Sequence, residues 1–207
     1  ERDTTNHQRF LSNSNYLNLY NFAIVLNGRW AHVDEWAKVR KEGREENFLK
    51  NTKLIDEFAE QFKQLSLEYK LSNINQAKSF SKYLDVIGAF YTDKNVDYEF
   101  LEEFKQEELL EIGRMEHHRW LQEHVDMGWT YGTPEKSRRE FERRHKDMMP
   151  GLTGFEVPFD AAAKHYDDGL DAVTQNKDTD PMECMLVMLR LYDGLRIYRI
   201  KNDTTGE

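Results

Sequence analysis

The amino-acid sequence predicts a mainly α-helical fold, in which a helical bundle is joined to a second helical domain that contains short strands and an ordered loop. Apolar residues recur at intervals of three and four in several long segments, and this spacing is typical of amphipathic helices. Aromatic residues make up 13% of the 207 residues, although 32% of the chain is charged. Disordered chains of similar charge are poor in rings, so this composition indicates a folded protein with a sizeable core.

The first part of the chain predicts two helices after a polar start. Residues 1–7 are polar, and we expect them to fray. Aromatic and aliphatic side chains then follow a helical spacing, which predicts a first helix that ends at Asn27-Gly28. We expect a short second helix over 31–39 and a charged surface loop over 40–46.

Two longer helices are predicted next. Apolar residues at three-four spacing favour one uninterrupted helix over 48–69. Ser72-Asn73 then predicts a break. Another helix is expected from Ile74 to a stop at Gly88.

The polar, turn-rich stretch 93–97 is the best candidate for a domain boundary. It predicts an N-terminal helical region over 1–95 and a second domain over 96–203. The sequence shows no internal repeat and no low-complexity tract.

The second domain begins with the longest predicted helix, over 98–127. Prolines, glycines and a capping aspartate mark the shorter elements that follow it. In order these are a partial helix over 135–146, an irregular ordered loop over 148–159 with a strand at 155–157, a helix from Asp160 to about Val173, a turn over 175–180, a helix from Pro181 to about Leu195, and a strand over 196–200.

Charge is distributed unevenly along the chain. The net charge of −9 argues against generic nucleic-acid binding, because neutralising phosphates requires a basic face. Residues 97–116 hold eight carboxylates, whereas residues 136–146 hold six lysines and arginines. An acidic helix therefore leads into the most distinctive motif, and a basic segment follows it.

Cysteine content and apolar run lengths indicate a cytoplasmic setting. Cys184 is the only cysteine, which excludes an intramolecular disulfide and a thiolate zinc cage. Its neighbours Met182, Met185 and Met188 predict a buried structural thiol. No apolar run approaches the roughly 20 residues that span a bilayer, and no secretory signal is present. Because the first residue is Glu1, we expect a piece of a longer protein, linked to a membrane only through a domain absent from this sequence.

The most distinctive motif is MEHHRWLQEHVDMGWTYG, residues 115–132. Helical spacing places Glu116 and His117 on the apolar side of their helix and His118 on the polar side. Arg119 follows Glu116 by three residues, close enough for an ion pair on the helix. A carboxylate, an imidazole and a guanidinium thus lie near the indole of Trp120, and if desolvated they must pair with one another or with a ligand.

These residues resemble the signature of the ryanodine-receptor repeat (RyR) domain, which reads E-H-x-x-W, then G-W-x-Y-G, a basic stretch, His-Pro, and V-P-[FW] before an acidic helix. The resemblance extends from about residue 97 to 200. The matching positions in this chain are Glu116, His117, Trp120, Gly128, Trp129, Tyr131, Gly132 and Val157-Pro158-Phe159. Met149 stands where the family has histidine, the loop 133–149 is longer than usual, and 151–156 is an insertion.

The resemblance implies a bacterial or phage binding module without catalysis, which recognises a small nucleotide-derived molecule in signalling or anti-phage defence. It implies no cofactor. Aromatic rings would stack on a base, and arginines would reach phosphates. The candidate ligand-binding residues are Glu116, His117, Arg119, Trp120, Trp129, Tyr131, Arg138 and Arg139.

Alternative interpretations stay open at this point. Glu116, His117 and Arg119 form either a self-satisfied polar network or a ligand contact, and the tryptophans are either core residues or ligand contacts. The basic segment 136–146 is otherwise a solvated helix with internal ion pairs. His117, His118 and His124 lack the spacing of a helical metal site, so no metal is expected. The competing class of protein is an interaction scaffold without a ligand. A hydrolytic site that uses Glu116 and His117 is a minor alternative. We also expect the chain to form a homodimer.

Overall fold

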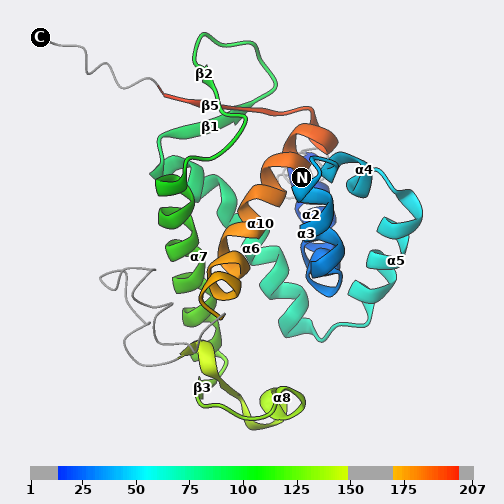
Figure 1. Cartoon of the computed structure of the whole chain (residues 1–207), viewed down its shortest axis with the longest axis vertical. Coiled ribbons are helices and arrows are strands. Elements are labelled where there is room, and N and C mark those ends of the chain that lie inside the picture. The colour runs from blue at the N-terminus through cyan, green and yellow to red at the C-terminus, as the bar shows by residue number, and fades with distance from the viewer. Residues whose placement is uncertain (1–13, 149–169, 201–207) are drawn as a thin grey trace, which may run out of the picture. The chain divides into compact units, whose positions relative to one another are not determined.

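The computed structural model of the chain describes residues 14–148 and 170–200, and these residues are mainly helical with a few short strands (Figure 1). They form two compact units: Glu1–Glu102 with Glu183–Glu207, and Glu103–Met182. Helix α10 (Leu170–Asp193) contributes residues to both units. None of the described helices combines the length and apolar character of a membrane-spanning segment.

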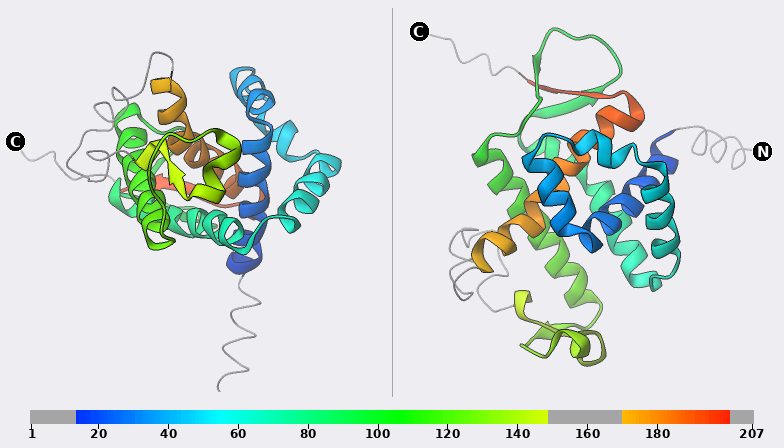
Figure 2. Two further views of the ribbon diagram at one scale, coloured as in Figure 1. Left: turned by 90° about the horizontal axis from the view of Figure 1, so that it is seen from below. Right: turned by 45° about the vertical axis from the view of Figure 1, so that its right-hand side comes forward.

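The first unit is built around helix α2 (Ser14–Ala31), which packs on α5 (Thr52–Lys63) and α6 (Leu67–Val86), as Figures 1 and 2 show. Two shorter helices, α3 (Val33–Lys41) and α4 (Glu45–Leu49), pack on each other. The buried side chains of this unit include Trp36, Phe48, Phe58, Phe62, Phe80, Leu84, Met185 and Met188. Rings of Trp36, Phe48 and Phe58 contact one another in sequence, with centroids 5.5 and 5.9 Å apart.

A three-stranded antiparallel sheet completes the first unit. Strand β5 (Arg196–Arg199) lies in the middle, between β1 (Ala89–Thr92) and β2 (Glu99–Phe100). The predicted strand over 196–200 is therefore confirmed. The polar stretch 93–97 lies between two strands that pair with the same neighbour.

The second unit contains helix α7 (Gln106–Asp126), followed by a small parallel pairing of β3 (Thr130–Tyr131) with β4 (Arg144–His145). Between these strands lie the 3-10 turn η1 (Lys136–Arg138) and helix α8 (Arg139–Glu142), and the turn η2 (Lys146–Met148) follows β4. The partial helix predicted over 135–146 is confirmed. The predicted loop from Met149 to 159, the strand at 155–157 and most of the helix from Asp160 lie outside the described residues, as do residues 1–7.

The predicted stop at Asn27-Gly28 is wrong, because α2 continues to Ala31. A Cβ atom on Gly28 would meet the ring of Phe58 at 2.1 Å. Gly28 therefore allows α2 to pack closely on α5 and does not end the helix. A glycine can serve either role, and the local sequence does not distinguish them.

Three other helix boundaries differ from the prediction. The expected helix over 48–69 is divided, because Asn51 caps α5 at Leu54 N and Ser66 caps α6 at Tyr69 N. The expected break at Ser72-Asn73 is wrong, since Asn73 donates to the Tyr69 carbonyl within α6. The charged loop predicted over 40–46 is only 42–44.

Two long-range effects account for the remaining differences. The helix predicted from Tyr98 begins at Gln106, because Glu99 and Phe100 pair with β5, a strand far away in the sequence. The turn predicted over 175–180 is helical, and Pro181 lies inside α10 rather than at its start. Proline removes one helical hydrogen bond. Pro181 and its neighbour Met182 are buried, so packing outweighs that local cost.

Candidate ligand-binding site

Helix α7 positions the residues of the distinctive motif in the second unit (Figure 1). At its start, the backbone N–H of Lys105 donates to Glu108 Oε1 at 2.8 Å. At its end, Gly128 adopts a φ of +80°, a conformation that favours glycine, and the Trp129 N–H donates to the His124 carbonyl at 2.9 Å. The chain therefore turns back at Gly128 and places Trp129 beside the last turn of the helix.

Glu116 and Arg119 form the predicted ion pair. Arg119 donates through Nε and one terminal nitrogen to the two carboxylate oxygens of Glu116, at 2.9 and 2.7 Å. The Glu116 side chain is 2% exposed and that of Arg119 is 17% exposed. Arg119 also donates to Glu123 at 3.2 Å. This two-pronged geometry is the strong form of a carboxylate–guanidinium contact.

His117 pairs with Asp178, a residue of α10 that the sequence analysis did not identify. The distance from His117 Nδ1 to Asp178 Oδ2 is 3.3 Å, and both residues are buried. Gly113, one turn before His117, is buried, and a Cβ there would lie 3.0 Å from Thr179 Cγ2. The absence of a side chain at Gly113 thus lets Asp178 approach His117.

Burial and neighbouring charges act in opposite directions on this pair. Burial lowers the pKa of His117, but the hydrogen bond and charge of Asp178, together with Asp147 and Glu116, outweigh it and raise this pKa above its ordinary value. Burial raises the pKa of Asp178, against the influence of His117. For His117 the neighbouring carboxylates outweigh burial, whereas for Asp178 burial outweighs the influence of His117.

Asp147 adds a third buried carboxylate to the group, which we call the polar cluster: Glu116, His117, Arg119, Glu123, Asp147 and Asp178. Asp147 is buried, 3.5 Å from Lys146 Nζ and 3.8 Å from His145 Nδ1. Its backbone N–H donates to the His145 ring at 3.0 Å. The cluster therefore combines α7 with α10 and with the turn after β4.

A second group, the ring cluster, is formed by His117, Trp120, His124, Trp129 and His145. Trp120 stacks on His124 with centroids 3.9 Å apart and lies 5.9 Å from His117 in a nearly parallel arrangement. His145 meets Trp120 edge-on at 5.0 Å. His124 meets Trp129 edge-on at 5.1 Å, which links the two tryptophans. Trp120 is partly exposed whereas Trp129 is buried, so Trp120 offers the more accessible indole.

The basic segment contacts the ring cluster through Arg143 rather than through the two arginines singled out from the sequence. Arg143 adopts a φ of +51°, uncommon for a residue with a side chain, and its guanidinium lies 5.8 Å from the Trp129 ring. Arg138 pairs with Glu142 at 2.9 Å, and its side chain is 65% exposed. The Arg139 Nε atom is buried without a hydrogen-bond partner among the described residues.

The structure thus brings together Glu116, His117, Arg119 and Trp120, with Trp129 joined to them through His124. Tyr131 is 38% exposed on β3, where its carbonyl accepts from Arg144 at 3.4 Å. Asp147, Asp178 and His145 complete the site but were not among the predicted residues. His124 was not predicted either, although it follows Trp120 by four residues and helical spacing places the two side chains next to each other. Nothing in the local sequence indicated Asp178.

The described residues define a helical protein whose second unit holds a charged cluster packed against stacked rings. They contain no group of three histidine, cysteine, aspartate or glutamate side chains arranged to hold a metal ion. No family model, no curated protein and no solved structure matches this chain. The function must therefore be argued from the site itself and from the resemblance of its motif.

The His117–Asp178 contact is expected to weaken as pH rises. Because the pKa of His117 is raised in the folded state, the contact contributes fully below the unfolded value of 6.5 and is lost as pH rises through the folded pKa. The stability difference between wild type and His117→Gln should therefore be larger at about pH 6 than at about pH 9.

Chemical denaturation of both proteins at the two pH values measures this difference. Val125→Ala, at an exposed position of the same helix with no titratable side chain, is the control and should show no comparable pH dependence. A His117→Gln effect that grows with pH would show that the ion pair is misassigned.

Proposed function

We propose that the chain is a non-catalytic regulatory module that binds a small nucleotide-derived molecule beside α7. One observation carries the proposal: the buried Glu116 and His117 lie within one helical turn of Trp120, a partly exposed indole that stacks on His124. A base stacked on an aromatic ring gains about 1–3 kcal/mol in single-stranded nucleic-acid binders. Arg143 and its basic neighbours supply cations for phosphates at the same end of the helix.

The motif supports the same class of function, because it resembles the signature of the ryanodine-receptor repeat domain. Glu116, His117, Trp120, Trp129 and Tyr131 occupy the signature positions. On that resemblance we place the protein in bacterial signalling or anti-phage defence, in the cytoplasm, as a homodimer. In this proposal a ligand orders the basic segment, and that ordering is passed to a partner domain or a second copy.

Isothermal calorimetry of the full chain against nucleotides and cyclic oligonucleotides tests the proposal. We expect saturable binding to at least one of them. Trp120→Ala should weaken it by about 1–3 kcal/mol, which is roughly fivefold to 150-fold, because the stacking surface is lost. Arg119→Lys should also weaken it, because lysine keeps the charge but not the planar fork.

The matched control is Trp30→Ala, which removes an indole that is 50% exposed on α2 in the other unit. It should leave nucleotide binding unchanged. If Trp30→Ala and Trp120→Ala reduced nucleotide affinity equally, the ligand would not bind at Trp120. Turnover of a nucleotide that disappears in Glu116→Gln would overturn the non-catalytic assignment.

One observation favours the competing function, an interaction scaffold without a ligand. The charged groups of the polar cluster pair with one another: Arg119 with Glu116 and Glu123, and His117 with Asp178. Such pairing fixes helices without any guest molecule. The scaffold would be favoured if no compound in the panel gave a binding signal in calorimetry and sedimentation velocity showed a stable dimer.

A further inference from the structure

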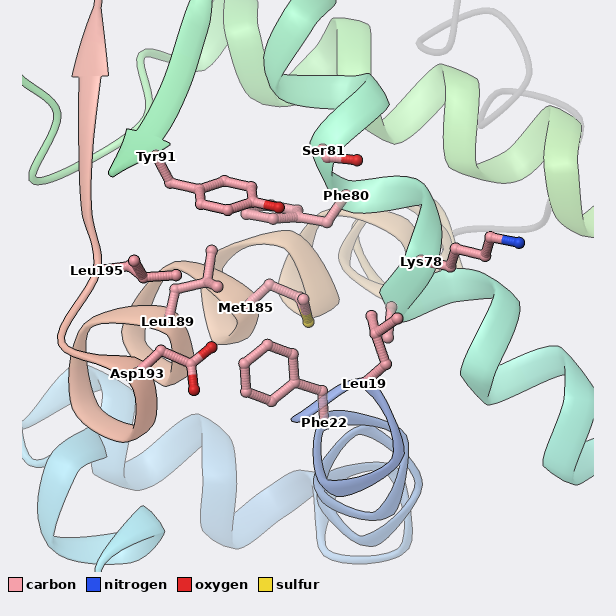
Figure 3. A pocket seen from close by; sticks show the side chains of 11 residues that line it. Leu19, Phe22, Lys78, Phe80, Ser81, Tyr91, Met185, Leu189, Asp193 and Leu195 are labelled. Atoms are coloured by element: carbon pink, nitrogen blue, oxygen red, sulfur yellow. The ribbon is translucent and has the colours of Figure 1, made fainter. Parts of the chain in front are cut away.

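The first unit contains a cavity of about 170 Å³, separate from the site on α7 (Figure 3). Its walls come from α2, α6, β1, the end of α10 and the residue before β5. All of the lining residues belong to the first unit, so one compact body defines the cavity. These segments lie far apart in the sequence, so the cavity exists only when the unit is folded.

The buried part of the wall, which we call the floor, is apolar and well anchored. It is formed by Phe22, Ala77, Phe80, Met185 and Leu189, each of which is no more than 5% exposed. Packing on the rest of the unit therefore holds these side chains in place. An engineered apolar cavity of about 150 Å³ in another protein binds benzene. The volume of this cavity is therefore sufficient for a single six-membered ring.

The charged side chains of the wall do not select a charged guest. Lys78 is exposed, and Figure 3 shows its ammonium group directed away from the cavity. Asp193 already interacts with another group, so its charge does not require a partner from a guest. One cation and one anion in the lining leave the wall without net charge. A charged guest would lose its hydration here without gaining a counter-ion, and a neutral guest avoids that cost.

Tyr91, on strand β1, adds a neutral polar group to the half-buried part of the wall. Figure 3 shows its side chain extending from β1 toward the side of the cavity that Phe80 forms. Within the described part of the chain, no hydrogen bond engages the Tyr91 hydroxyl. A guest that covers this hydroxyl removes it from water and must return a hydrogen bond, because a buried polar group without a partner is costly. A guest with one neutral hydroxyl meets this requirement.

We propose that this cavity binds a small neutral aryl alcohol, with its ring between Phe22, Phe80 and Met185 and its hydroxyl hydrogen-bonded to that of Tyr91. The floor selects a single ring by its volume and its apolar character. The wall selects a neutral guest because it carries no net charge. The cavity and the nucleotide site proposed on α7 belong to different units, so the failure of one proposal does not decide the other.

Four probes of similar size test these preferences on the wild-type full chain. Benzyl alcohol, ethylbenzene, benzylamine and benzoate each have one ring with a short substituent, but they differ in polarity and charge. In ligand-observed NMR titrations, benzyl alcohol and ethylbenzene should both bind saturably. Benzylamine and benzoate are ionised at neutral pH, and each should bind at least about tenfold more weakly than benzyl alcohol because neither finds a counter-ion.

Tyr91→Phe tests the recognition of the hydroxyl, because it removes one oxygen and keeps the ring. It should weaken benzyl alcohol binding about threefold to tenfold, as expected for the loss of one hydrogen bond, and leave ethylbenzene binding nearly unchanged. Tyr98→Phe is the matched control, because Tyr98 is a 46% exposed tyrosine of the same unit that does not line the cavity. It should bind both probes like wild type.

Ala77→Met tests the location of the ring. It should abolish binding of both neutral probes by filling the cavity, because Ala77 is 2% exposed in its floor. Ala37→Met, at an exposed position on α3, is the control for the added side chain and should bind like wild type. Circular dichroism checks that each variant is folded, and Tyr91→Phe tests the site independently if Ala77→Met does not fold.

Three results would overturn the proposal. If neither neutral probe binds wild type, the cavity takes no guest of this kind. If benzylamine or benzoate binds as tightly as benzyl alcohol, the cavity does not select a neutral guest. If ethylbenzene binds but benzyl alcohol does not, or if Tyr91→Phe leaves benzyl alcohol affinity unchanged, Tyr91 does not recognise the hydroxyl.

Discussion

Replacing Arg119 by methionine is expected to lower the free energy of unfolding by about 3 kcal/mol, because it leaves a buried carboxylate without its main partner. The Glu116 side chain is 2% exposed, and both of its oxygens accept from Arg119. Methionine preserves much of the apolar stem of arginine, so the loss should report the missing guanidinium rather than a cavity. Urea denaturation monitored by circular dichroism measures it.

A double-mutant cycle separates the ion pair from other effects of the substitution. Glu116→Gln together with Arg119→Met should be less destabilising than the sum of the two single variants, since neither partner is left charged and alone. Lys63→Met is the matched control, because Lys63 and Glu60 form an exposed pair with the same spacing on α5. It should cause no measurable loss. If the stability losses of Glu116→Gln and Arg119→Met were additive, the contribution of Glu116 to stability would not depend on Arg119.

Gly28→Ala is the second substitution with a large expected effect, a loss of about 3 kcal/mol from overpacking. In the interior of a helix, alanine is ordinarily favoured over glycine by about 1 kcal/mol. Here an alanine Cβ would lie 2.1 to 2.5 Å from three atoms of the Phe58 ring, and Phe58 is fully buried. The ring and the backbone of α2 must then separate, which disturbs the contact between α2 and α5. Thermal and urea denaturation measure the change.

Two further variants control this prediction. Asn27→Ala, at the adjacent position of α2, removes side-chain atoms from the same helix instead of adding them and should cost far less. Adding Phe58→Leu to Gly28→Ala should recover part of the loss, because the smaller side chain makes room for the new methyl group. An increase in stability in Gly28→Ala would mean that α2 and α5 do not pack closely at this point.

The elements that could be predicted are those whose signals are local. Three-four spacing correctly placed Glu116 and His117 on the buried side of α7, and the glycine at 88 correctly ended α6. Glycine at 28 carried the same local signal but has a packing role. The sequence does not distinguish these two uses, because the difference lies in Phe58, thirty residues further along the chain.

The site was predictable only in part, because local sequence signals do not reveal contacts between residues that lie far apart in the chain. Contacts within α7, such as Glu116 with Arg119, follow from helical geometry. The partner of His117 does not, since Asp178 lies on α10 near a proline that locally predicts a helix start. The contact between Arg143 and the Trp129 ring could not be predicted either, because it depends on the parallel pairing of β3 with β4.

The most direct test of the central proposal, that the clusters on α7 hold a nucleotide-derived guest, is mass spectrometry of small molecules released by denaturing natively purified protein. The wild-type chain should release a nucleotide-derived molecule in an amount comparable to the protein. Trp120→Ala, purified in the same way, should release much less because the stacking surface is gone. Release of no such molecule from wild type, or of equal amounts from both proteins, would contradict the proposal.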